Sequence, residues 1–176
     1  STRVLEKVQA LGAARIGERR LKELVKQYGL ATIKAFIEAW MDYGERRAIA
    51  AIRELPAGTW SYTVRHDPVP KVADEGVPIT AKVTIDPKQG KVIVDVRDNP
   101  DCVPGGPRVA ERRVGAACRT GGRSRWAPSH PNKHGSASRI EVLMRDNCVV
   151  GRPQHPIGTS CATSNVNERL ANAVAC

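Results

Sequence analysis

The sequence predicts an α+β fold, in which an N-terminal helical hairpin packs on a mostly antiparallel β-sheet and a further helix lies at the C-terminal end. Two different spacings of the apolar residues along the chain predict this class. Apolar residues recur at helical spacing through residues 1–55, and they alternate with polar residues, as in strands, in several runs of residues 56–176. We therefore divide the chain into a helical hairpin, residues 1–55, and a mixed, β-rich part of the same domain, residues 56–176.

The N-terminal residues are predicted to form two amphipathic helices. Val4 and Leu11 lie on one face of the first helix, because they are seven residues apart. Gly29 suits the left-handed conformation that commonly ends a helix. The second helix ends before the breaker run Pro56-Ala57-Gly58. Because the connection between the helices is short, we expect them to pair antiparallel.

Alternating apolar and polar residues predict the strands of the sheet. Residues 86–90 are predicted to be a hairpin loop between the second and third strands, and the proline-rich residues 66–78 a longer loop. Residues 148–150 are a candidate extension of the sheet. The predicted strands cover residues 60–64, 79–85, 92–97 and 140–144.

A last helix is predicted to begin at Asn165. Glu168 stands three residues later, which is the spacing of a capping box, and Leu170 and Val174 supply an apolar face. No apolar stretch in the chain approaches the ~20 residues that a membrane-spanning helix needs. We therefore expect no membrane association.

The chain is basic, with a formal net charge of +10, and half of that charge lies in one segment. Residues 104–130 hold six arginines and one acidic residue, and they contain no Leu, Ile, Met, Phe or Tyr. A basic nucleic-acid-binding module is one interpretation, since arginines neutralise phosphates. Trp126 is the sole aromatic residue of this segment that could stack on a base, so we disfavour nucleic acid as a partner.

The cysteines and histidines do not predict a metal site. The five cysteines are odd in number and form no C-x-x-C pair, which indicates neither a zinc site nor a disulfide framework. We expect reduced thiols and a cytoplasmic protein. The four histidines lie on proline-rich loops at no ligand spacing, and we expect them to be exposed. No phosphate-binding G-x-x-x-x-G-K-[ST] run occurs.

Two carboxylates follow the third predicted strand. Asp95 and Asp98 open a D-x-x-D-N-P run, where carboxylates could act as a general acid or base or bind a hard cation. Aspartate and asparagine in such runs more often bond nearby backbone amides in a turn. Both interpretations stay open here.

Small hydroxylated residues precede the last helix. Thr159, Ser160 and Ser164 lead into Asn165, where free backbone amides and the positive helix end could hold an anion or a substrate. The alternative is simple capping of the helix. We name these residues as candidates for anion or substrate binding. The residue pattern identifies no catalytic residue.

Several motifs in a fixed order resemble the hydantoinase B/5-oxoprolinase family. They begin with GAARIGERRLKEL and include DYGERR and the run from Val94 to Pro100. The resemblance covers about residues 10–106 and 131–176. The matching runs are residues 12–24, 28–29, 42–47, 55–60, 94–100, 132–140 and 147–151.

The resemblance implies the B-type subunit of a complex such as an ATP-dependent hydantoinase, N-methylhydantoinase, 5-oxoprolinase or caprolactamase. Family members of this type pair with an A-type, actin-like ATPase subunit. The complex uses ATP to open a cyclic amide, or, in the alternative, to carboxylate a ketone such as acetone or acetophenone. B-type subunits are several hundred residues long, so the chain resembles an internal piece that would be inactive alone.

The cofactors that the resemblance implies belong elsewhere in such a complex. ATP would bind to the partner ATPase. A divalent metal (Zn, Mn or Mg) would be held by Asp and His residues N-terminal to the matched portion, so no residue of this chain inherits that role.

Residues 104–130 depart from the family pattern, which expects a helix of small and apolar residues there. Arg, Gly, Pro and Ala make up 18 of these 27 residues, as expected when a GC-rich gene is read out of frame. Two compensating frame shifts are our hypothesis for this segment, and local divergence is the alternative. If the segment is genuine, we expect its lack of large apolar residues to loosen the local fold.

Overall fold

The computed structural model describes residues 2–102, 111–126, 134–152 and 165–176. The chain divides into two compact units, Ser1–Asp42 and Tyr43–Cys176, and each is described by itself. Within the described residues, no helix is both long enough and apolar enough to cross a membrane.

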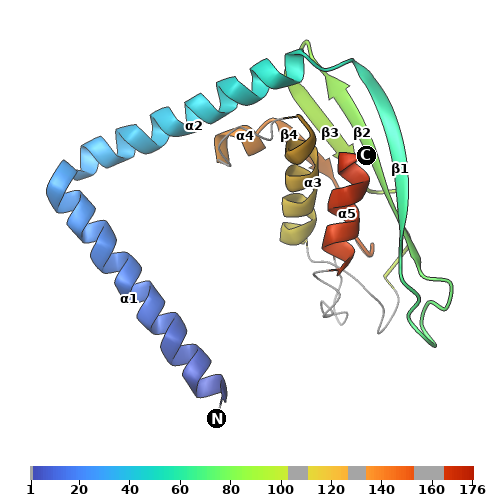
Figure 1. The fold of residues 1–176 in the computed structure, drawn as a ribbon, viewed down its shortest axis with the longest axis horizontal. Coiled ribbons are helices and arrows are strands. Elements are labelled where there is room, and N and C mark those ends of the chain that lie inside the picture. Colours follow the sequence, from blue (N-terminus) through green and yellow to red (C-terminus); the bar gives the residue numbers. More distant parts are fainter. Residues whose placement is uncertain (1, 103–110, 127–133, 153–164) are drawn as a thin grey trace. The chain divides into compact units, whose positions relative to one another are not determined.

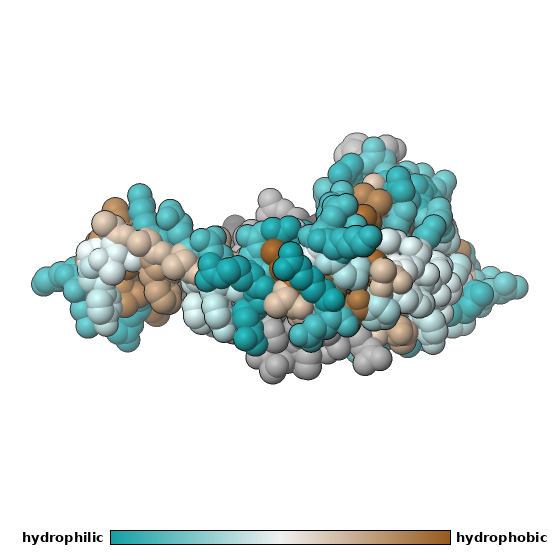
Figure 2. All heavy atoms as spheres, turned by 90° about the horizontal axis from the view of Figure 1, so that it is seen from above, coloured by the Kyte–Doolittle hydropathy of each residue, from teal (hydrophilic) through white to brown (hydrophobic). Residues whose placement is uncertain are grey.

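The first unit contains helix α1 (Thr2–Tyr28) and the beginning of helix α2 (Leu30–Arg53). Gly29 separates the helices with a φ of 82°, so the predicted helix-ending glycine is confirmed. Of residues 9–42, whose side chains the structure describes, none is buried, and Figure 2 shows brown apolar surface between hydrophilic residues. The antiparallel pairing of these helices and their packing on the sheet therefore stay predictions.

The second unit is built on a four-stranded sheet in the order β1-β2-β3-β4 (Figure 1). The strands β1 to β3 pair antiparallel, and β3 pairs with β4 in parallel, so the predicted mostly antiparallel sheet in an α+β fold is confirmed. The hairpin between β2 and β3 closes with Gly90 at a φ of 60°. The strands are β1 (Gly58–His66), β2 (Val77–Asp86), β3 (Lys91–Asp95) and β4 (Ile140–Leu143).

Two helices, α3 (Glu111–Trp126) and α5 (Asn165–Ala175), lie side by side over one face of this sheet (Figure 1). The helix that we predicted to begin at Asn165 is thus confirmed. Alternate residues of β2 and β3 point at these helices and form the core with them. Its fully buried members include Ile52, Ile79, Val92, Val94, Val96, Val114, Val166 and Leu170.

The end of α2 belongs to this second unit. Ile52 is completely buried in the core, and Gly90 lies so close to Ile49 that a Cβ atom on the glycine would approach Ile49 Cγ2 to 2.9 Å. Glu45 accepts a hydrogen bond from Arg139, which lies between the short helix α4 (His134–Ala137) and β4. These contacts anchor the last turns of α2 where the two parallel strands, β3 and β4, begin.

The expectation that residues 104–130 loosen the fold is wrong for the part that the structure describes. Val114, Ala117 and Cys118 of α3 are buried, and Gly121 lies against the backbone of α5. Small residues contribute to the core here because they let the two helix backbones approach closely. The frame-shift hypothesis concerns the origin of the segment and stays a hypothesis.

Residues 148–150 are buried, but they do not extend the sheet. Cys148 forms an isolated bridge with Asp101, and the amide of Val149 donates to the carbonyl of Pro100 at 3.1 Å. The backbone bends at Asn147, with a φ of 51°, before a turn in which the Gly151 amide donates to the Cys148 carbonyl at 3.1 Å. Asparagine tolerates that left-handed conformation better than most residues.

Candidate functional site

The carboxylate of Asp95 ends strand β3 and is bound by Arg97. The guanidinium donates Nε to Oδ1 at 2.9 Å and Nη2 to Oδ2 at 2.7 Å, and the Arg97 amide donates to Oδ1 at 3.0 Å. The side-chain hydrogen bonds from Arg97 hold the pKa of Asp95 below its usual value. A carboxylate stabilised in its ionised form is a weak proton acceptor, so the contacts favour the turn interpretation of Asp95.

Asp98 lies in the turn after β3, and its side chain is exposed. Neither Asp95 nor Asp98 lines the apolar pocket described below. An acid–base role for this pair stays a prediction.

Asn99, in the same turn, is buried, and its side chain bonds three backbone groups of two residues, Thr80 and Val96. Its Oδ1 accepts the Thr80 amide at 2.7 Å, and its Nδ2 donates to the carbonyls of Thr80 at 2.7 Å and of Val96 at 2.8 Å. All these groups are polar atoms that would be costly to leave unpaired in the interior. Asn99 therefore holds β2 to the end of β3.

Arg145, which follows β4, also binds the turn after β3. Its guanidinium donates to the carbonyl oxygens of four residues at 2.6–3.1 Å and contacts the Asp101 carboxylate at 2.6 Å. The planar guanidinium suits this role because it presents several donors in fixed directions. The four carbonyls belong to Arg97, Asn99, Asp146 and Asn147.

The sequence pattern predicts a strand that ends at residue 144, directly before Arg145, and it does not single out Asn99. The D-N-P run could have identified Asn99 as a turn residue, but its bonds reach residues 19 positions away along the chain. For Arg145, no local signal exists, since three of its partners, Arg97, Asn99 and Asp101, lie more than 40 positions away. Together, the hydrogen bonds of Asn99 and Arg145 form a network that fixes the conformation of the turn after β3.

Only one of the four residues of the predicted anion site, Asn165 at the N-terminus of α5, lies among the described residues. Asn165 is the first residue of the helix and is exposed, and Glu168 lies in its first turn. Thr159, Ser160 and Ser164 lie outside the described residues. Binding of an anion or a substrate at this helix end stays a prediction.

His66 is buried at the end of β1, so the expectation of an exposed loop histidine is wrong at this position. Its Nδ1 lies 2.8 Å from the carbonyl oxygen of Asp67, and its buried Nε2 has no partner among the described residues. The strand continues two residues beyond the alternating pattern that predicted its end, and this extension carries the ring into the interior.

The described residues offer no cluster of metal ligands, and two of their cysteines have thiols of raised pKa. No three His, Cys, Asp or Glu side chains in that part of the chain lie close enough to hold a metal ion. Burial raises the pKa of the Cys118 thiol to about 12 and also raises that of Cys148. Because the thiolate is the nucleophile, neither cysteine is activated at neutral pH.

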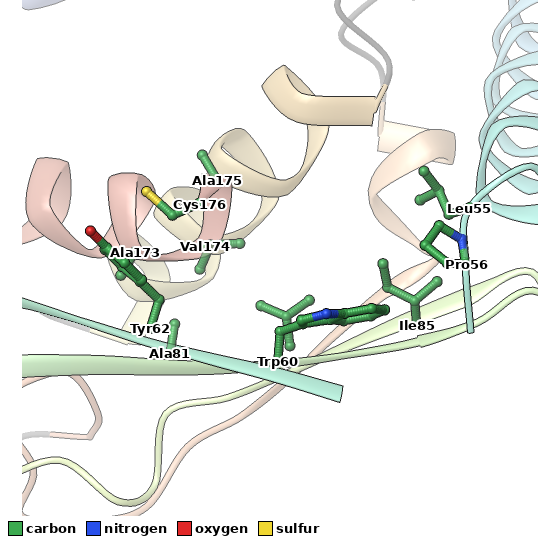
Figure 3. Close-up of a pocket in the computed structure, with 11 residues that line it drawn as sticks. Leu55, Pro56, Trp60, Tyr62, Ala81, Ile85, Ala173, Val174, Ala175 and Cys176 are labelled. Atoms are coloured by element: carbon green, nitrogen blue, oxygen red, sulfur yellow. The ribbon is translucent and has the colours of Figure 1, made fainter. Parts of the chain in front are cut away.

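An apolar pocket of about 400 Å³ lies beyond the last turn of α5, against the face of β1 and β2 (Figure 3). Trp60 and Tyr62 form part of its wall and are each about half exposed, at 48% and 49%. Among the described residues that line it there is no acidic, basic or histidine side chain, so its wall is mostly apolar. The lining residues are Leu55, Pro56, Trp60, Tyr62, Ala81, Val83, Ile85, Ala173, Val174, Ala175 and Cys176.

Comparison with known families accounts for nearly the whole chain. The family model described as hydantoinase B/oxoprolinase matches residues 6–176. This chain belongs to the hydantoinase B/oxoprolinase family. The match includes the arginine-rich residues 104–130, which the family motifs in the sequence do not cover.

Two relatives show how the chain relates to longer proteins. Over 80 residues it is 36% identical to the B-type subunit of a putative D-/L-hydantoinase from Pseudomonas sp. (strain NS671), a match that covers 42% of this chain and 13% of that protein. Its fold is similar to that of an ATP-dependent caprolactamase from Pseudomonas jessenii, with a TM-score of 0.81 and 26% identity. That similarity covers 94% of this chain and 28% of the caprolactamase chain. The chain therefore spans less than a third of each relative.

Proposed function

We propose that this chain forms part of the non-ATPase, B-type subunit of an ATP-dependent cyclic-amide hydrolase. The observation that carries the proposal is the likeness to the ATP-dependent caprolactamase over 94% of the chain, within a shared family. The putative D-/L-hydantoinase supports the same class of substrate, because hydantoin, like caprolactam, is a cyclic amide. Lactams, hydantoins and 5-oxoproline are the substrates that we would test first.

Within that subunit, the described sheet and its helices act as a scaffold, apart from the candidate substrate-binding end of α5 at Asn165. Asp95 is engaged by Arg97, Asn99 and Arg145 are hydrogen-bonded to backbone groups, and the apolar pocket has no acidic, basic or histidine side chain among its described lining residues. The described residues do not fit a divalent metal, and the sequence has no P-loop. ATP, a metal and the catalytic groups are accordingly proposed to lie elsewhere in the complex, with an actin-like ATPase as partner and a cytoplasmic location.

Substrate-dependent ATP turnover by the assembled enzyme tests the proposal. The reaction is followed with hydantoin, 5-oxoproline or caprolactam, and separately with acetophenone plus bicarbonate. Release of ADP together with the ring-opened product of a cyclic amide is the expected result. Turnover that requires both the ketone and bicarbonate would instead establish the alternative, an ATP-dependent ketone carboxylase.

A further inference from the structure

We draw no further inference here: the strongest candidate, the apolar pocket between the last turn of α5 and the face of β1 and β2, is an unpartnered apolar surface, and nothing in the structure shows what covers it.

Discussion

Gly121 of α3 lies directly against the backbone of Ala171 in α5, so that a Cβ atom on the glycine would stand 2.2 Å from the Ala171 carbonyl oxygen. Real Cβ atoms do not approach oxygen so closely, and the obstacle is a helix backbone that cannot rotate away. The arginine-rich helix can join the core because glycine at this position lets the two helices meet.

Replacement of Gly121 by alanine should therefore lower the free energy of unfolding by about 1–3 kcal/mol, the usual cost of overpacking a core. Gly115→Ala in the same helix is the matched control, because the nearest atom to its Cβ would be the mobile end of the Arg119 side chain. Alanine should stabilise an interior helix position by up to ~1 kcal/mol where there is room. Urea unfolding of both variants provides the measurement, and equal stability would contradict the close helix contact.

Asn99→Ala should destabilise the second unit more than other polar truncations. The change leaves the Thr80 amide and the carbonyls of Thr80 and Val96 without their side-chain partner. Since a buried polar group without a partner costs about 1–3 kcal/mol, we expect a total loss of about 2–4 kcal/mol. Asn172→Ala, at an exposed position of α5, is the control and should change stability by less than ~0.5 kcal/mol. Similar midpoints of urea unfolding for the two variants would rule out the proposed role of Asn99.

Asp95→Asn should have an effect that depends on pH. The pKa of Asp95 is lowered in the folded chain, so its stabilising contribution is complete above the unfolded pKa of about 3.9. That contribution is lost as the pH falls through the folded pKa. At neutral pH the free energy of unfolding of the variant should fall by about 1 kcal/mol or less, because an ion pair with a partner as exposed as Arg97 contributes little.

The measurement is the difference in unfolding free energy between the unmodified chain and the variant, taken from neutral pH down into the acid range. The difference should shrink as the medium becomes more acidic. Asp98→Asn, at an exposed position of the same turn, serves as the control. A difference for Asp95→Asn that stays constant across this range would show that the ion pair with Arg97 is not its source.

The predicted role of the α5 N-terminus can be separated from capping. Replacing Ser164 and Asn165 together by alanine should cost about 0.5–2 kcal/mol of stability if only a helix cap is lost. If this helix end also holds substrate, kcat/KM of the assembled enzyme should fall by more than the loss of folded protein explains. Reduced stability with unchanged kcat/KM would leave these residues as a cap alone. Asn172→Ala again provides a control on the same helix.

The sequence by itself determined the elements of this protein that depend on local pattern. Alternation of apolar and polar residues located the four strands of the described sheet, and the capping spacing at Asn165 located the start of α5. The order of the family motifs indicated the family that the match over residues 6–176 then established. These predictions succeeded because burial on one face of a strand or helix leaves a period in the sequence.

The tertiary structure alone decided which residues carry the polar network and which small residues form the core. Arg145 binds carbonyls on the far side of the β3 turn, His66 turns inward at a strand end, and Gly121 meets α5. None of these contacts produces a repeating pattern of residue types in the nearby sequence, because each joins segments that are distant along the chain. Whether a glycine packs against a helix or an arginine finds buried carbonyls depends on which segment the fold brings against it, and residue type at one position does not contain that information.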